Sequence, residues 1–125
     1  MAARCAAQAM IGAGKKGSVV FVGESCFRSA IPGYCALVSS MGALRSLARG
    51  LALDFARHGI RVNCVMSGPA AGREVRPGPG GIGSPATPEQ IAGAVWFFAS
   101  GQAGNATGAS LTIDGGADCL VPGAY

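Results

Sequence analysis

Residues 32–65 read PGYCALVSSMGALRSLARGLALDFARHGIRVNCV and contain the strongest structural pattern in the sequence. From about Cys35 to His58, apolar residues recur at spacings of four and three, the pattern of an amphipathic helix. Gly59 is placed to end that helix, and residues 60–66, IRVNCVM, predict a strand directly after it. A strand so close behind a helix indicates a β-α-β crossover and a parallel sheet. The apolar stripe consists of Leu37, Met41, Leu44, Ala48, Leu51 and Phe55.

The segments on either side continue the alternation of helix and strand, which predicts one α/β domain over residues 1–125. An Ala-rich helix and a loop fill residues 1–17; a strand, the long helix and a second strand fill residues 18–66. A Gly/Pro-rich loop follows at residues 67–86, then a closing helix and strand at residues 87–116 and a tail at residues 117–125. The closing helix begins with Thr-Pro-Glu-Gln at residues 87–90, a strong capping-box signal.

Composition narrows the classes of function. The 125 residues suffice for a single core, and the net charge of +4 comes from basic residues scattered along the chain, which disfavours nucleic-acid binding. Five cysteines with no Cys-x-x-Cys pair, beside one histidine, give no metal-binding spacing and favour reduced thiols in a cytoplasmic protein. No apolar run reaches membrane-spanning length, so we expect no membrane partner.

Residues 12–17, GAGKKG, match the spacing of a dinucleotide-binding turn, G-x-G-x-x-G. That turn requires a strand before it and a helix after it, so that phosphate meets the helix N-terminus. Here a helix precedes and a strand follows, so we predict an ordinary connecting loop.

Four segments resemble the short-chain dehydrogenase/reductase family of NAD(P)-dependent oxidoreductases. They are GSVVFVGE at residues 17–24, residues 33–65 with their ending HGIRVNCV, SGP at residues 67–69, and residues 86–116. The resemblance implies a partial Rossmann-like parallel sheet, with only the second half of the family pattern. The nucleotide-binding first half has no counterpart, so we expect no bound cofactor unless another chain or a longer gene product supplies that half. The resemblance implies that Gly68 and Pro69 are a remnant of the cofactor-binding part.

The resemblance places the family's catalytic Ser on Glu24, which Ser25 follows, its Tyr on Leu37 and its Lys on Met41. Leu and Met can neither donate a proton nor stabilise an anion, so the family's hydride transfer should be lost. Three other residues are candidates to act in their place: Glu24, whose carboxylate could be a general acid or base, Ser25 through its hydroxyl, and Tyr34 through its phenol.

Other polar side chains carry simpler interpretations. Ser39 and Ser40 are expected on the helix surface, and His58 is expected to compensate the helix dipole. Arg45 and Arg49 share one helix face and are best explained as a solvated or subunit-facing patch.

Three hypotheses remain open. The chain is a redox-inactive protein that binds itself or a partner chain through its long helix and exposed sheet edge; the resemblance implies that this helix pairs with its twin in a dimer. It is a repurposed isomerase, cyclase or dehydratase with a small-molecule ligand near Glu24. Or it is a fragment of a full-length reductase.

Overall fold

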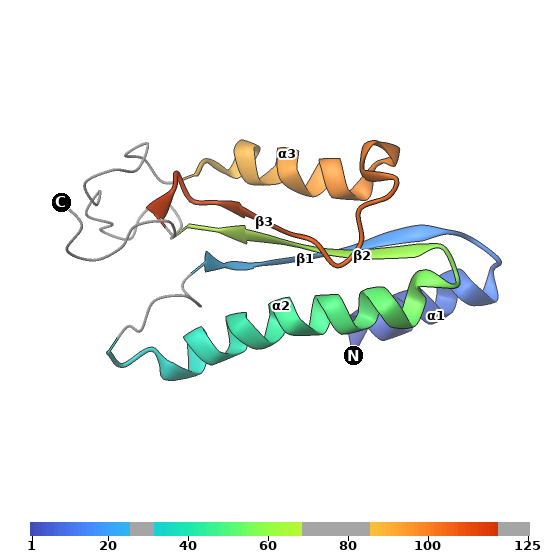
Figure 1. Cartoon of the computed structure of the whole chain (residues 1–125), viewed down its shortest axis with the longest axis horizontal. Helices are drawn as coiled ribbons and strands as arrows, with labels where there is room; N and C mark the ends of the chain where they lie inside the picture. Colours follow the sequence, from blue (N-terminus) through green and yellow to red (C-terminus); the bar gives the residue numbers. More distant parts are fainter. Residues whose placement is uncertain (26–31, 69–85, 118–125) are drawn as a thin grey trace.

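The computed structural model describes residues 1–25, 32–68 and 86–117, which form a parallel sheet with helices on both faces (Figure 1). Three strands, β1 (Gly17–Glu24), β2 (Ile60–Ser67) and β3 (Ser110–Ile113), lie in the order β1-β2-β3. The helices are α1 (Ala2–Gly12), α2 (Cys35–Ala56) and α3 (Pro88–Ala99), followed by a 3-10 turn, η2 (Gly101–Ala103). The α/β class and the parallel sheet predicted from the sequence are therefore confirmed.

The element ends differ from the sequence prediction by one or two residues, for physical reasons. The in-register pairing of β1 with β2 runs from Gly17 opposite Ile60 to Glu24 opposite Ser67, which extends both strands. The long helix ends at Ala56, and the positive φ of Gly59, 67°, turns the chain into β2. The turn η2 has no periodic signal in the sequence.

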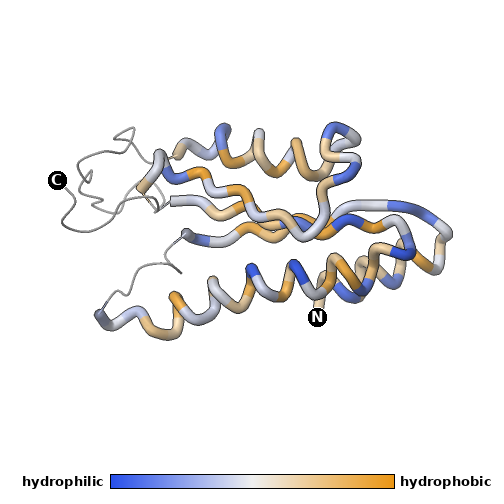
Figure 2. Tube along the Cα trace, in the orientation of Figure 1, coloured by the Kyte–Doolittle hydropathy of each residue, from blue (hydrophilic) through white to orange (hydrophobic). Residues whose placement is uncertain are grey.

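The side chains of the strands alternate between two apolar clusters, one under each helical layer. On the α2 face, Val62, Cys64 and Met66 of β2 pack with Ala48 and Ala52 of α2. On the α3 face, Val65 packs with Ala94 and Phe98. Figure 2 shows hydrophobic residues gathered along the strands and hydrophilic ones in the turn between α1 and β1. β2, whose residues 62–66 are all buried, is the central strand of both clusters.

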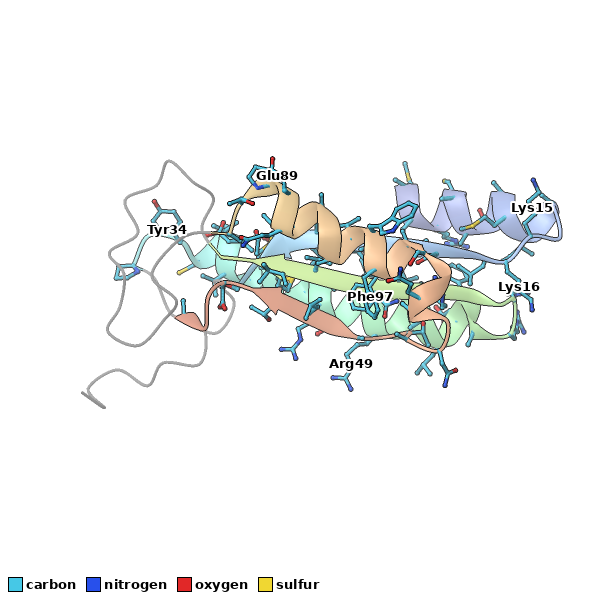
Figure 3. The ribbon with its side chains drawn as sticks, turned by 90° about the horizontal axis from the view of Figure 1, so that it is seen from above. Lys15, Lys16, Tyr34, Arg49, Glu89 and Phe97 are labelled. Atoms are coloured by element: carbon cyan, nitrogen blue, oxygen red, sulfur yellow. The ribbon has the colours of Figure 1, made fainter. Side chains whose placement is uncertain are left out.

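The two crossovers have opposite hands. The strands advance in one direction from β1 to β3, while α2 covers one face of the sheet and α3 the other (Figures 1 and 3). The β1-α2-β2 unit has the usual right hand, so β2-α3-β3 is left-handed, which is uncommon for parallel strands. The chain between β2 and α3, residues 68–87, is long enough to reach the other face.

Polar side chains of β2 fasten the segment between α3 and β3. Asn63 is fully buried, donates from Nδ2 to the carbonyl of Ala106 over 2.8 Å, and accepts the Ala109 N–H at Oδ1 over 3.0 Å. The Thr107 hydroxyl accepts the backbone N–H of Val62 at 3.1 Å. These bonds hold the chain in position to enter β3 beside β2.

The guanidinium of Arg61 caps the C-terminus of α3. It donates to the carbonyls of Phe98 at 2.7 Å and Ser100 at 3.0 Å. Ser18, the register partner of Arg61 on β1, donates to the same Phe98 carbonyl at 2.9 Å. A cation at this end of the helix satisfies otherwise unpaired carbonyls and opposes the helix dipole.

The N-terminus of α3 carries the predicted capping box. Thr87 Oγ1 accepts the Gln90 N–H at 3.3 Å, and Gln90 Oε1 accepts the Thr87 N–H at 2.9 Å. A hydrogen bond from the backbone N–H of Glu89 to its own carboxylate lowers the pKa of this residue below its ordinary 4.5. A hydrogen bond from the Thr87 hydroxyl lowers that pKa further, by a smaller effect.

The glycine-rich residues 12–17 connect α1 to β1, as the sequence analysis predicted, and Gly14 has a φ of 64°. Met10 of α1 lies over Gly17, where a Cβ atom would have no room. None of the helices in the described ranges is long and apolar enough to cross a membrane.

Candidate functional site

The candidate site lies where the strands end. Glu24 is the last residue of β1 and stands opposite Ser67, the last residue of β2. The Ser67 hydroxyl donates to the Gly23 carbonyl at 3.4 Å, which ties the two strand ends together. Carboxyl ends of parallel strands are the usual place for ligands in such sheets. The sequence analysis did not identify Ser67 as a polar neighbour of Glu24. The position of both residues at the ends of consecutive strands could have indicated that they lie together.

Met41 reaches this strand end from α2. Its Sδ accepts the backbone N–H of Glu24 at 3.2 Å. A Cβ atom on Gly23 would lie 3.0 Å from Leu44 Cδ2 and 3.1 Å from both Met41 Sδ and Met66 Cε. The structure therefore brings Glu24 and Met41 together, through a thioether packed against the backbone of β1. Leu37, one helical turn earlier, is partly buried.

Ser25 and Tyr34 occupy different environments. Ser25 directly follows β1 and is buried. Tyr34 is the residue before α2, with φ −112° and ψ 21°, and its side chain is exposed at that end of the helix (Figure 3). The catalytic roles considered for Glu24, Ser25 and Tyr34 stay predictions.

Gly68 has a packing role that the sequence did not reveal. Its N–H donates to the Ile113 carbonyl at 2.9 Å, and a Cβ atom there would lie 3.1 Å from both Cα and Cβ of Asp114. The glycine thus allows the end of β2 to approach the turn after β3. A cofactor-binding role for Gly68 stays a prediction, and Pro69 lies outside the described residues.

Among the described residues, the polar side chains at the strand ends are the hydroxyls of Ser25 and Ser67 and the carboxylates of Glu24 and Asp114, while the positions where the resemblance places the Tyr and Lys are apolar. Hydroxyls and carboxylates can hydrogen-bond a ligand and move a proton, but none of these groups is a cation that could hold an anionic ligand. Within the described ranges, no cluster of three His, Cys, Asp or Glu side chains could hold a metal ion.

The cysteines lie outside this arrangement. Burial raises the pKa of the Cys64 thiol above its ordinary 9.0, which the Arg45 guanidinium partly offsets. A buried thiol of this kind is a core residue and a poor nucleophile. Cys5 and Cys35 are exposed free thiols, while Cys26 and Cys119 lie outside the described residues.

The remaining polar residues singled out in the sequence lie on helix surfaces or ends. Ser39 and Ser40 are exposed, and the Ser40 hydroxyl donates to the Leu37 carbonyl at 2.8 Å. His58 follows the end of α2 and accepts at Nε2 from Arg57 Nε at 3.1 Å. Arg49 is exposed on α2 (Figure 3).

Comparison with known proteins agrees with the architecture. A family model described as enoyl-(acyl carrier protein) reductase matches residues 1–118. The chain is 33% identical over 127 residues to Protein MoaE of Klebsiella aerogenes, covering 85% of this chain and 49% of that protein. It is 34% identical over 116 residues to the short-chain dehydrogenase virB of Hypocrea virens, covering 82% and 47%.

Among solved structures, acetoin dehydrogenase from Enterobacter cloacae superposes with a TM-score of 0.87 at 26% identity, covering 98% of this chain and 52% of that one. The chain thus spans about half the length of the curated relatives that it matches. Because the family model matches nearly all of its residues, the chain belongs to the short-chain dehydrogenase/reductase family.

Proposed function

We propose that this chain does not transfer hydride on its own and acts as a partner-binding or self-associating member of its family. The contact between Met41 Sδ and the Glu24 N–H carries this proposal, because a thioether packed against β1 fills the position where the resemblance expects an ammonium group.

The chemistry of the neighbouring positions supports the same conclusion. Leu37 offers no proton where the resemblance places a Tyr, and Glu24 stands where it places a Ser. A Lys that lowers the pKa of a Tyr and holds a ribose acts through its charge, which Met41 lacks. With Glu24, Leu37 and Met41 at these three positions, both the proton donor and the cation that activates it are missing.

Partner binding is supported by apolar side chains that the fold leaves in solvent. Leu53, on the long helix α2, is 81% exposed, and Leu47 on the same helix is exposed as well. Side chains such as these are available to pack against a partner chain.

Nucleotide titration tests the proposal. Purified chain is titrated with NADH and NADPH up to about 1 mM by isothermal calorimetry, a range that would detect even weak sites. 4-Hydroxyisoleucine dehydrogenase, whose structure was solved with NADH and succinate, is the positive control. We expect no saturable heat from this chain; saturable binding of either nucleotide would refute the proposal.

A second candidate is that the sequence is part of a full-length NAD(P)-dependent reductase. Its coverage of only about half of each relative favours this reading. Sequencing the DNA upstream of Met1 in all frames tests it. A coding segment for a strand with a Gly-rich turn would support it, and its absence in every frame would exclude it.

The third candidate, a non-redox enzyme, depends on Glu24. The grouping of this carboxylate with Ser25 and Ser67 at the strand ends favours a small-molecule site there. Glu24→Gln should abolish turnover of the substrate of an isomerase or dehydratase, with Glu89→Gln on the outer helix α3 as the matched control. Equal activity of the Glu24→Gln variant and the parent would rule out this role.

A further inference from the structure

A polar pocket lies at the amino ends of β1 and β2, at the opposite end of the sheet from the candidate site. Its volume is about 540 Å³, and its walls come from the turn before β1, the turn between α2 and β2, and the segment that follows α3. None of the described residues that line it is Asp or Glu. The side chains around the pocket therefore carry two positive charges and no negative one. The polar side chains are those of Lys16, Ser18, Arg61, Ser100, Asn105 and Thr107.

Lys16 is held beside this pocket by its aliphatic stem. A Cβ atom on Gly59 would lie 2.8 Å from Lys16 Cγ and 3.1 Å from Lys16 Cδ, so the stem packs against the bare glycine in the turn that leads into β2. A lysine stem can cover such a surface while its ammonium group stays in water. Figure 3 shows Lys16 on the β2 side of its turn and Lys15 beside the end of α1. Lys15 is not among the described residues that line the pocket.

The backbone carbonyls at the helix ends beside the pocket already have hydrogen-bond donors. Arg61 donates to the carbonyls of Phe98 and Ser100 at the end of α3. At the end of α2, the Ala56 carbonyl accepts the Gly59 N–H at 2.9 Å. Free carbonyls at these two ends would repel an anion, and these bonds occupy them. The arginine also opposes the negative end of the α3 dipole, so the neighbouring lysine adds further positive charge.

Several hydrogen-bond donors remain for a ligand. The Thr107 hydroxyl accepts the Val62 N–H at 3.1 Å, which leaves its own proton to donate. The Arg61 guanidinium has N–H groups beyond those that reach the two carbonyls, and Asn105 is exposed with its amide NH₂ group. A phosphate group suits donors of this kind, because it carries a charge of about −1.5 to −2 at neutral pH and its oxygens are strong acceptors.

We propose that this pocket binds a phosphate group. Lys16 and Arg61 supply the positive charge, and Thr107 and Asn105 supply hydrogen bonds from uncharged groups. The volume lies within the range of about 300–1,000 Å³ that small-molecule sites occupy, so the phosphate can belong to a small phosphate monoester. The site does not depend on the proposed partner binding, and it is separate from the strand ends around Glu24.

Titrations followed by nuclear magnetic resonance test the site. The ¹⁵N-labelled chain is titrated with inorganic phosphate and, separately, with glycerol 3-phosphate, each up to about 10 mM at constant ionic strength, a range that detects sites of millimolar affinity. We expect saturable shifts of the Asn105 side-chain amide and of the Gly101 N–H, with the Ser67 N–H at the other end of the sheet unchanged. Tighter binding of the ester would identify a phosphorylated small molecule as the ligand, and equal binding would identify free phosphate; either result supports the site.

The adjacent lysines provide a matched pair of variants. Lys16→Met keeps an unbranched stem over Gly59 but removes the charge, and it should weaken phosphate binding about tenfold. Lys15→Met removes the same charge one residue away and should leave the affinity within about twofold, while Lys16→Arg should retain most of it. Urea unfolding should show that all three variants keep the stability of the parent, as surface substitutions usually do.

Three results would overturn the proposal: no saturable shift with either ligand, shifts centred on the carboxyl ends of the strands, or equal weakening by Lys15→Met and Lys16→Met. NADH and NADPH also carry phosphate, so the nucleotide titration is repeated with Lys16→Met. Heat that this variant abolishes comes from the pocket described here, whereas saturable heat that survives in it counts against the proposed function.

Discussion

Replacing Asn63 by Ala should strongly destabilise the fold, although this residue stands apart from the strand ends. Asn63 is fully buried and makes two hydrogen bonds, of 2.8 Å and 3.0 Å, to the segment that leads into β3. The substitution removes these bonds from the Ala106 carbonyl and the Ala109 N–H, which belong to partly buried residues and face the fully buried position 63. Each polar group left unsatisfied in the interior costs about 1–3 kcal/mol, so the free energy of unfolding should fall by about 4 kcal/mol.

That loss is large for a small domain, whose total stability is typically about 5–15 kcal/mol. With a urea dependence of about 1.5–2 kcal/mol per molar, the unfolding midpoint should drop by roughly 2–3 M. Equilibrium urea unfolding followed by far-ultraviolet circular dichroism measures both the midpoint and the slope.

Asn105→Ala provides the matched control, since Asn105 is an exposed asparagine of the same connecting segment. It should change stability by no more than about 0.5 kcal/mol, as surface substitutions usually do. If Asn63→Ala cost as little as Asn105→Ala, the reasoning about the buried amide would be wrong.

Three further predictions concern charged and titratable groups. Arg61→Met should cost about 2 kcal/mol in urea unfolding, because two charge-assisted bonds to the end of α3 are lost, while Arg57→Met on the exposed helix end should cost almost nothing. Because burial raises the pKa of Cys64 in the folded state, the stability that this thiol contributes is fully present below pH 9.0 and is lost as pH rises above that value. Cys64→Ala should therefore flatten the curve of unfolding free energy against pH above pH 9.0. An unchanged slope would contradict the burial argument. Because the pKa of Glu89 is lowered in the folded state, the pH dependence has the opposite direction, and the stability that this carboxylate contributes is lost as pH falls below 4.5. Glu89→Gln should reduce that loss in thermal melts between about pH 3 and 6.

The elements themselves were predictable because their signals are local. The spacing of Leu37, Met41 and Leu44 indicated α2, and Thr87 with Gln90 indicated the start of α3. The position of β2 directly after α2 indicated a parallel pair.

The side-chain bonds of β2 and the left-handed crossover were not predictable from these local patterns. Asn63 bonds to residues more than forty positions away, and Arg61 bonds to a helix end 37 positions away. No periodicity links such partners, and a hydrophobic pattern does not show which face of the sheet a later helix will cover. At the candidate site, the sequence placed Glu24 at a strand end, while the roles of Gly23 and Gly68 required knowing which atoms approach them.

The side-chain hydrogen bonds of β2 that stabilise the fold lie at the opposite end of the strands from the candidate site. Arg61 and Asn63, in its first half, hold the closing helix and the entry to β3. The candidate site lies at the other end, around Glu24 and Met41. Substitutions at the site can therefore alter chemistry without loosening these bonds, so a chain of this kind can lose an activity by mutation and remain foldable. For the same reason, residues 60–63, IRVN, indicate that the fold is kept. Finding this segment in another sequence does not show whether that protein still catalyses a reaction.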